Sequence, residues 1–358
     1  MIKLRVIISA GGTGGHIYPA LSILKKIKEK EPDSEFLYIG TTNRMEKDIV
    51  PKMGINYKGL NVIGLKKDLS LFKAGPLFIK AVKDSKKIIK NFNPDVVIGV
   101  GGYITAPVIY SAKKLGYKTV IHEQNSISGK TNQFLSRYAD KILISLPGSK
   151  KYFKKETILT GNPRSEEAYY AKALPKSEFG LSNDKKLVLI VMGSLGSTTI
   201  SNALMEIIPK FDKKDYEVLI VTGKDYYEKY PKNLPENVFI VPFIDNMVNL
   251  LKSVDVIVTR AGASTIAEIL AIGIPSIFVP SPYVANNHQY YNAKELVDNS
   301  AALLLEEKDF NSDNLLKKID LLLENGVLYK EMSENAKKLG IISSCGKIYE
   351  EIKKLVRG

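Results

Sequence analysis

The sequence has few of the residues that form covalent cross-links and metal sites. Its 358 residues include one cysteine, Cys345, and three histidines, His16, His122 and His288. A single cysteine excludes an intramolecular disulfide and a cysteine-rich zinc site, and it fits a reducing compartment. Cys345 stands in a polar stretch without a neighbouring histidine, which argues against a catalytic thiol.

Long apolar runs are also missing. No segment approaches the ~20 consecutive apolar residues that a membrane-spanning helix needs. The apolar run at residues 4–10 is too short for the core of a signal peptide, and a cluster of glycines follows it. We therefore expect a soluble or peripheral protein in which this run is a buried strand.

Acidic residues are scarce in one half of the chain only. The net charge is +14, and residues 1–162 carry 28 Lys and Arg against 12 Asp and Glu, whereas residues 163–358 carry 24 against 26. This asymmetry suggests that the first half meets an anionic surface, either nucleic acid or acidic lipid. The alternative is a lysine-rich surface that is merely solvated. No interleaved aromatics or recognised motif support nucleic acid, so we do not expect it as a partner.

Short apolar runs alternate with helical patterns through both halves. The runs are rich in Val, Ile and Leu without strict alternation, which is typical of strands buried on both faces of a parallel sheet. We predict an α/β protein with two Rossmann-like, doubly wound parallel-sheet domains, because one core rarely serves a chain of this length. We place the domains at residues 1–162 and 163–340, with a terminal helix over 335–356. The expected strands lie at 4–10, 36–40, 96–100, 119–122 and 141–146, and at 187–192, 218–222, 238–242, 256–259 and 276–280.

The loops after these strands are where an open α/β sheet binds its ligands. The first loop reads Gly11-Gly12-Thr13-Gly14-Gly15-His16, and its glycines would let backbone amides approach an anionic group at a helix N-terminus. It matches neither the dinucleotide fingerprint nor a Walker A loop, which disfavours a dehydrogenase. His16 is a candidate general base, since an unperturbed imidazole has a pKa near ~6.5. The alternative is a helix-capping histidine.

Two further loops of the first half carry polar or glycine-rich sequence. Gly101-Gly102-Tyr103 follows the strand at 96–100 and suggests a second wall of the same site. The segment His122–Asn125, followed by Gly129 and Asn132, places polar groups where burial without partners would cost ~1–3 kcal/mol each. We expect them to bond one another or a polyhydroxylated ligand. Its first two residues point to opposite faces of a strand, which disfavours a metal site.

In the second half, small residues open two turns that suit a diphosphate. Ser194 lies in the turn 193–197, and residues 260–268 open a helix whose dipole favours a pyrophosphate. Glu268 could accept bonds from a ribose, or it could be a surface residue. There is no Asp-x-Asp clamp, so we expect Arg164, hydroxyls and the helix dipole to neutralise a leaving diphosphate. We expect no tightly bound cofactor and no side-chain motif dedicated to a divalent ion.

These loops, in this order, resemble the MurG family of bacterial glycosyltransferases, over essentially the whole chain. The resemblance implies a GT-B fold, with two domains facing across a cleft and a last helix, at about 341–358, that returns to the first domain. It implies an inverting transfer of N-acetylglucosamine from UDP-GlcNAc to the C4 hydroxyl of undecaprenyl-diphosphate-linked N-acetylmuramyl-pentapeptide in peptidoglycan synthesis. The segments that carry it are Gly11–His16, Gly101–Tyr103, His122–Asn125 with Gly129 and Asn132, Gly161–Arg164, Arg260–Glu268 and His288-Gln289.

The resemblance also implies roles for individual residues. The base would be His16, with Glu123 as the alternative. The acceptor contacts would be Gly11, Gly12, Gly101, Gly102, Tyr103 and His122. The donor contacts would be Thr13, Gly14, Gly15, Asn125, Arg164, Ser194, Ile244, Ala263, Ser264, Thr265, Ile266, Ala267, Glu268 and Gln289. The turn at 192–196 lacks the glutamine that the family usually has there.

Residues 65–90 combine an apolar cluster with many lysines, which suits the surface of an acidic leaflet. The residues that we expect at the membrane are Leu71, Phe72, Lys73, Leu77, Phe78 and Lys80. Together with this expectation, the resemblance implies a peripheral location on the cytoplasmic face of the bacterial membrane. The alternative is a helix whose apolar face packs inward. Two enzyme alternatives remain: a related transferase that glycosylates diacylglycerol, and a sugar-nucleotide epimerase with the same fold.

Overall fold

The computed structural model describes residues 3–62, 71–193 and 198–358, with side chains from residue 75 onward in the second range. The chain divides into two compact units. The first unit comprises Met1–Arg164 and Ser343–Gly358, and the second comprises Ser165–Ile342. The sequence-based boundary, between residues 162 and 163, lies two residues before this division.

The first unit contains a seven-stranded parallel sheet in the order β3-β2-β1-β4-β5-β6-β7. The order reverses between β1 and β4, which is where doubly wound sheets bind ligands. The strands are β1 Arg5–Ser9, β2 Glu35–Thr41, β3 Asn56–Leu60, β4 Val96–Gly99, β5 Lys118–Glu123, β6 Lys141–Ile144 and β7 Ile158–Leu159.

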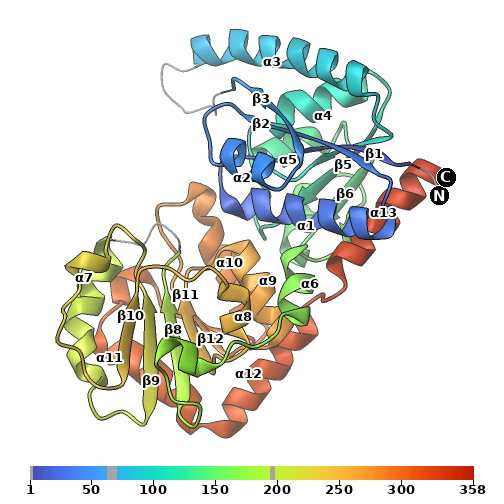
Figure 1. Ribbon diagram of the computed structural model, residues 1–358. Coiled ribbons are helices and arrows are strands. Elements are labelled where there is room, and N and C mark those ends of the chain that lie inside the picture. Colours follow the sequence, from blue (N-terminus) through green and yellow to red (C-terminus); the bar gives the residue numbers. More distant parts are fainter. Residues whose placement is uncertain (1–2, 63–70, 194–197) are drawn as a thin grey trace. The chain divides into compact units, whose positions relative to one another are not determined.

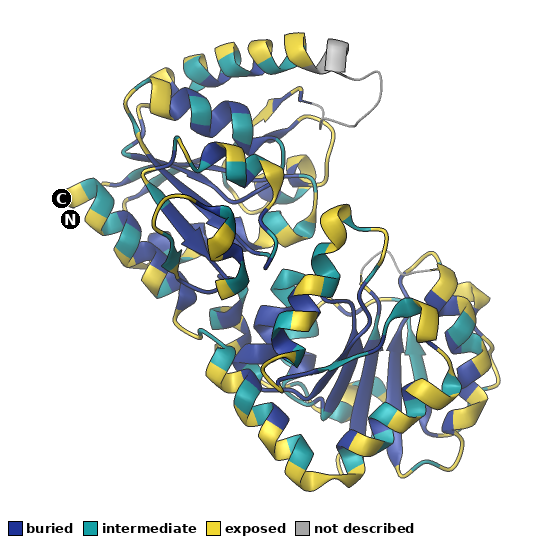
Figure 2. Ribbon diagram, turned by 180° about the vertical axis from the view of Figure 1, so that it is seen from behind, coloured by how far each residue is buried: buried dark blue, intermediate teal, exposed yellow. Residues whose placement is uncertain are grey.

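Helices cover both faces of this sheet, and each face has its own apolar core (Figures 1 and 2). Helices α1 and α13 lie side by side on one face, and α3, α4 and α5 lie on the other. The helices are α1 Gly14–Lys30, α2 Glu46–Lys52, α3 Leu71–Phe92, α4 Thr105–Lys114, α5 Lys130–Leu135, η1 Pro147–Tyr152 and α13 Ser344–Arg357, with α6 Arg164–Tyr170 at the boundary.

The second unit repeats this plan with a six-stranded parallel sheet in the order β10-β9-β8-β11-β12-β13. The strands are β8 Lys186–Val191, β9 Tyr216–Val221, β10 Val238–Val241, β11 Val256–Thr259, β12 Ser276–Phe278 and β13 Leu303–Leu304. The helices are η2 Lys176–Phe179, α7 Thr198–Ile207, η3 Ile208–Phe211, η4 Tyr227–Lys229, α8 Met247–Leu251, α9 Ala263–Ile272, η5 Ala285–Asn287, α10 His288–Val297, η6 Glu307–Asp309, α11 Ser312–Glu324 and α12 Gly326–Leu339.

The predicted class, two doubly wound parallel-sheet domains, is confirmed, and each of the ten expected strands is present. Three strands were missed. β3 has the sequence Asn-Tyr-Lys-Gly-Leu and is largely exposed at the sheet edge, so it lacks the apolar run of a central strand. β7 and β13 are edge strands of two residues each.

The expectation of one terminal helix over 335–356 was wrong. α12 ends at Leu339, and α13 begins at Ser344. Gly340 adopts an extended conformation, and a Cβ atom on it would stand 2.8 Å from the carbonyl oxygen of Leu270. The close approach of α9 therefore requires glycine here, and the chain leaves the helix at this point.

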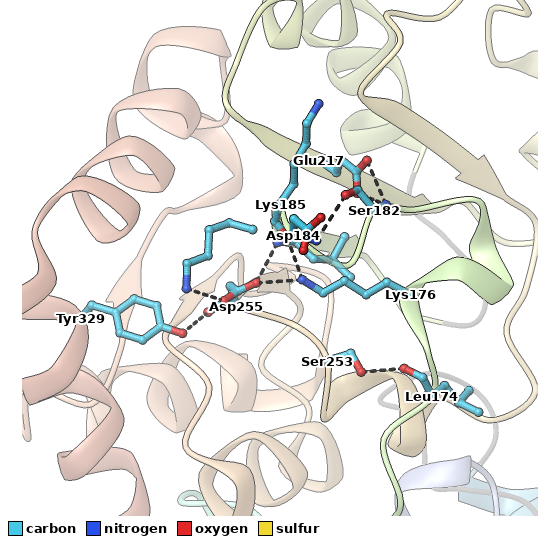
Figure 3. Close-up of polar contacts among 11 residues, drawn as sticks. Leu174, Lys176, Ser182, Asp184, Lys185, Glu217, Ser253, Asp255 and Tyr329 are labelled. Atoms are coloured by element: carbon cyan, nitrogen blue, oxygen red, sulfur yellow. Dashed lines mark hydrogen bonds and ion pairs between the residues drawn. The ribbon is translucent and has the colours of Figure 1, made fainter.

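An aspartate anchors the amino end of a central strand in both sheets. The carboxylate of Asp255 accepts from the Leu187 amide (2.8 Å), and its own amide donates back to the Leu187 carbonyl (2.9 Å). Figure 3 shows this carboxylate with Lys176 and the Asp255 carbonyl with Tyr329. Asp95 pairs with Arg5 in the same reciprocal way in the first sheet. Both aspartates therefore lie at the end of the sheet where the strands begin, opposite the carboxyl ends of the strands.

Candidate active-site loops of the two units

In the first unit, the loops that follow β1 and β4 lie against each other. The Gly11 amide donates to the Gly101 carbonyl oxygen at 3.3 Å. Gly102 has a φ of +86°, and a Cβ atom on it would overlap the Gly11 carbonyl. The expected proximity of the two glycine loops is therefore confirmed, and it depends on the absence of side chains at the contact.

His16 lies in the first turn of α1 with its imidazole between the two loops. Its Nδ1 is 3.2 Å from the Gly11 carbonyl oxygen. Because a carbonyl oxygen only accepts, the neutral imidazole donates from Nδ1 and presents a lone pair at Nε2. A Cβ atom on Gly101 would stand 2.8 Å from Nε2, so glycine makes room for the ring. Thr13, Gly14 and Gly15 form the helix start just before it.

Glu46, which the sequence analysis missed, lies beneath the first glycine loop. Its side chain is 0% exposed at the start of α2. The carboxylate accepts from the amide (3.0 Å) and hydroxyl (2.7 Å) of Thr41 and from the Gly12 amide (3.4 Å). The link from Glu46 to the glycine loop leaves no local signal in the sequence, because Gly12 lies 34 residues away along the chain.

Glu123 is the centre of a buried hydrogen-bond network at the end of β5. Its carboxylate, in a residue 2% exposed, accepts from the Asn125 amide at 3.0 Å, the Gly129 amide at 2.9 Å and Asn132 Nδ2 at 2.9 Å. Ser128 Oγ and Asn125 Nδ2 also donate to it. As expected from the cost of unpaired burial, these polar residues bond one another. The network sets the path of the chain around Asn125.

His122 is fully buried on the other side of β5. Its Nε2 lies 3.0 Å from the Gly161 carbonyl, and its Nδ1 lies 2.9 Å from Gln124 Nε2. Burial lowers the pKa of His122 to about 4, against the opposing effects of the Gly161 bond and the Glu123 charge. The ring is therefore neutral at physiological pH, with Nε2–H donating to Gly161. Its predicted contact with the acceptor stays a prediction.

Arg164 begins α6 at the boundary of the first unit. Its amide donates to Asn162 Oδ1 at 3.1 Å, and its guanidinium lies 5.8 Å from the centre of the Tyr18 ring. The Asn162 carbonyl accepts from Ser344 Oγ at 2.7 Å. The first residues of α13 thus hold the segment that positions Arg164.

In the second unit, the loop after β11 leads into α9 through small residues. Gly262 caps the helix, and Ala263, Ser264 and Thr265 form its first turn. Ile266, Ala267 and Glu268 are buried, and Glu268 is only 8% exposed. The alternative that Glu268 is an ordinary surface residue was therefore wrong.

The side chains around this loop are held by hydrogen bonds. The Arg260 guanidinium donates to the Val279 carbonyl (2.9 Å) and pairs with Glu307 (2.6 Å). Gln289 Oε1 accepts from the Ser281 amide at 2.8 Å, which ties α10 to the end of β12. The Ile244 side chain is buried. Ser194 lies outside the described residues.

No group of three or more His, Cys, Asp or Glu gathers as a metal site in the residues that the structure describes. No helix in this described part of the chain is both long enough and apolar enough to cross a membrane.

Two doubly wound parallel-sheet units, with glycine-rich or small-residue loops at the carboxyl ends of their strands, have the architecture of the GT-B class, which glycosyltransferases share with sugar-nucleotide epimerases. Residues 6–144 match the N-terminal domain model of glycosyltransferase family 28, and residues 187–344 match its C-terminal domain model. The chain belongs to this family and, within it, to the UDP-N-acetylglucosamine–N-acetylmuramyl-(pentapeptide) pyrophosphoryl-undecaprenol N-acetylglucosamine transferases.

The similarity to individual relatives extends over full length. A transferase of this name from Bacillus cytotoxicus is 47% identical, over 99% of this chain and 100% of its own. The one from Bacillus subtilis is 44% identical, over 98% and 100%. The crystal structure of Acinetobacter baumannii MurG superimposes with a TM-score of 0.81 at 27% identity, over 98% of this chain and 99% of its own.

Proposed function

We propose that this enzyme transfers N-acetylglucosamine from UDP-GlcNAc to the C4 hydroxyl of undecaprenyl-diphosphate-linked N-acetylmuramyl-pentapeptide, with inversion at the anomeric carbon. Relatives 44–47% identical over full length carry the name of this reaction. The observation that supports the chemistry is the His16 imidazole, held by the Gly11 carbonyl in a glycine-lined loop. This is a step of peptidoglycan synthesis that converts lipid I to lipid II.

We assign the base to His16 rather than to Glu123. Five hydrogen bonds hold the Glu123 carboxylate in place, and turning it toward an acceptor would break the bonds that hold the Asn125 loop. His16 is half-buried, and the Gly11 carbonyl oxygen holds its Nδ1, so Nε2 is the ring atom that would receive the proton. In the proposed step, Nε2 takes the proton of the C4 hydroxyl while its oxygen bonds to the anomeric carbon. The bond from that carbon to the diphosphate breaks, and its electron pair leaves with UDP.

The second unit supplies the nucleotide site in this proposal. First-turn amides lack partners within their own helix, and the amino end of a helix dipole is positive, so the start of α9 favours a diphosphate. Ser264 and Thr265 add hydroxyls, and Glu268 would accept from the ribose. Arg164 would carry a compensating positive charge. We expect no tightly bound cofactor and no dedicated metal ligand.

The test is an assay with labelled UDP-GlcNAc and two acceptors, the lipid-linked muramyl-pentapeptide and diacylglycerol. We expect product from the first acceptor only. His16→Ala should lower turnover by ~10²–10⁴-fold, as loss of a general base does, whereas Ser22→Ala on the same helix should leave it unchanged. Comparable turnover with diacylglycerol would support the alternative transferase. A His16→Ala enzyme with normal turnover would remove His16 from the role of base.

We further infer peripheral attachment to an anionic membrane surface through α3 of the first unit. Lys80, Lys83, Lys87 and Lys90 are exposed on this helix, and Ile79 is 70% exposed. Leu77 and Phe78 are half-buried. The side chains of Leu71, Phe72 and Lys73 lie outside the described residues. An exposed apolar side chain among lysines supports the predicted contact with an acidic leaflet.

A further inference from the structure

We propose that Glu46 is a positioning residue that acts on His16 through the peptide group joining Gly11 and Gly12. This peptide group is bonded on both sides. Its oxygen, on Gly11, accepts from His16 Nδ1 at 3.2 Å, and its N–H, on Gly12, donates to Glu46 Oε2 at 3.4 Å. A carboxylate, a peptide and an imidazole therefore form one hydrogen-bonded chain. The inference rests on the proposed role of His16 as the base.

Such a chain affects the imidazole because hydrogen bonds in series polarise one another in an environment of low dielectric constant. The negative charge of the Glu46 carboxylate polarises the Gly12 N–H that it accepts from. This polarisation of the peptide group makes the Gly11 carbonyl oxygen more negative. That oxygen then holds the Nδ1–H tautomer more firmly and stabilises the imidazolium that forms when Nε2 takes a proton. A carboxylate that bonds a catalytic histidine directly has the same two effects; here the peptide transmits them.

The surroundings of Glu46 are built to receive its carboxylate. A Cβ atom on Gly11 would stand 2.5 Å from its Oε1, and one on Gly40 would stand 2.8 Å from its Cγ. Its charge acts on Tyr38 from β2 and on Tyr57 from β3, and Tyr57 also feels the charge of Asp48 on α2. Burial, followed by the charge of Glu46, raises the pKa of both tyrosines, so they remain neutral.

The hydroxyls of these two tyrosines donate to backbone carbonyls and not to the Glu46 carboxylate. Tyr38 donates to the Ala10 carbonyl at 3.0 Å, and Tyr57 donates to the Thr41 carbonyl at 2.5 Å. Their hydroxyls therefore buttress the two segments that flank Glu46, and the carboxylate itself is left to bond Thr41 and the Gly12 amide.

The informative substitution is Glu46→Gln, which keeps the shape of the side chain. Two donors of Thr41, its amide and its hydroxyl, bond Oε1 of Glu46. The single side-chain oxygen of glutamine would therefore take the position of Oε1. The new NH₂ group would then face the Gly12 N–H, so this one hydrogen bond would be lost.

We expect Glu46→Gln to lower kcat at least ~10-fold, less than removal of the base would. The KM for UDP-GlcNAc should stay within about twofold, since a positioning residue for the base does not bind donor. The acid limb of the kcat/KM profile should move to lower pH, because the imidazolium loses stabilisation.

Asp140→Asn is the matched control in the same unit. Asp140 accepts from the amide and the hydroxyl of Thr119, both at 2.9 Å, as Glu46 does from Thr41, but it lies at the amino end of β6, away from the loops that follow the strands. We expect this variant to lower Tm without moving the acid limb. If Glu46→Gln lowers Tm to the same degree and leaves kcat and the acid limb unchanged, the proposal is overturned.

A measurement on the unmodified enzyme tests the proposal even if Glu46→Gln does not fold. With ¹⁵N-labelled histidine, the ring shifts of the three histidines report their tautomers. We expect His16 as Nδ1–H and His122, whose Nε2 bonds Gly161, as the Nε2–H reference. An Nε2–H tautomer for His16 would refute the chain of bonds. Normal turnover of His16→Ala would instead refute the proposed base, so the two failures are distinguishable.

Discussion

At Gly101 the backbone has a φ of +110°, and a Cβ atom would stand 2.5 Å from Cδ2 of His16. We expect Gly101→Ala to displace the imidazole and to lower kcat by about tenfold or more, since small misplacements of a reacting group are costly. Because alanine adopts a positive φ only at a cost, the substitution should also lower the free energy of unfolding by about 1–2 kcal/mol. Steady-state kinetics and thermal unfolding measure the two effects.

Gly54→Ala separates backbone strain from contact with the base. Gly54 also has a positive φ, +72°, but nothing lies within 4 Å of the position that a Cβ atom on it would take. The Gly54→Ala variant should lose about as much stability as Gly101→Ala does, but its turnover should be unchanged. Equal kcat in the two variants would contradict the argument from Gly101.

The buried His122 makes stability depend on pH in a defined direction. Its pKa is about 4 in the folded protein and near ~6.5 when unfolded. Above pH 6.5 the His122 imidazole is neutral in both the folded and the unfolded state. Between pH 6.5 and 4 it binds a proton in the unfolded state but not in the folded state. Stability is therefore lost as the pH falls from 6.5 toward 4. Between pH 7 and 5 this should amount to about 2 kcal/mol.

Urea denaturation of the wild type and of His122→Gln at the two pH values measures this contribution. The glutamine variant should be less stable than the wild type at pH 7, because it disturbs the bonds to Gly161 and Gln124. The difference between the two proteins should shrink at pH 5. A difference that is the same at both pH values would show that His122 does not titrate as argued.

At the scale of elements, α13 completes the first unit although it lies at the far end of the sequence. Ile348 and Ile352 are fully buried in the core that α1 shares. Tyr349 donates to Glu31 at the end of α1 at 2.8 Å, and Lys141 on β6 pairs with Glu351. The returning helix is thus part of the core and not an appendage.

We expect Ile348→Ala to destabilise the first unit by about 2–5 kcal/mol, the usual cost of such a cavity. Because the chain has two units, hydrogen exchange is the suitable measurement: amides of α1 and α13 should exchange faster, and those of α9 and α11 should not. Lys347→Ala, at an exposed neighbouring position, serves as the control. Faster exchange throughout both units would contradict a local role for α13.

The pattern of residues could predict elements wherever the pattern was local. Central strands such as β1 and β8 were found because they are continuous runs of Val, Ile and Leu buried on both faces. The polar edge strand β3 was missed because it has no apolar run, and its pairing with β2 cannot be seen in the sequence. The break between α12 and α13 was missed because it depends on the contact of Gly340 with α9.

At the scale of the whole molecule, the excess positive charge lies in residues 1–162. We expect binding to vesicles that rises with the fraction of anionic lipid and falls with salt, since each lysine near the surface contributes ~1 kcal/mol and is screened. Cosedimentation with neutral and anionic vesicles at two salt concentrations measures this.

Charge-reversal variants locate the membrane contact. Lys83→Glu with Lys87→Glu, both exposed on α3, should weaken the binding, whereas Lys317→Glu, exposed on α11 of the second unit, should not. Equal binding to neutral vesicles at every salt concentration would argue against an electrostatic contact.

The sequence by itself determined the family, the α/β class, the positions of the central strands and the glycine-rich loops, because each of these can be recognised from residues that stand close together in the chain. Only the tertiary structure decided which partners those loops have. Glu46 meets Gly12 from 34 residues away, His122 meets Gly161 from 39, and Ser344 meets Asn162 from 182. A hydrogen bond between such distant residues leaves no periodicity or spacing in the sequence, since it forms only when the folded unit brings the segments that carry them together.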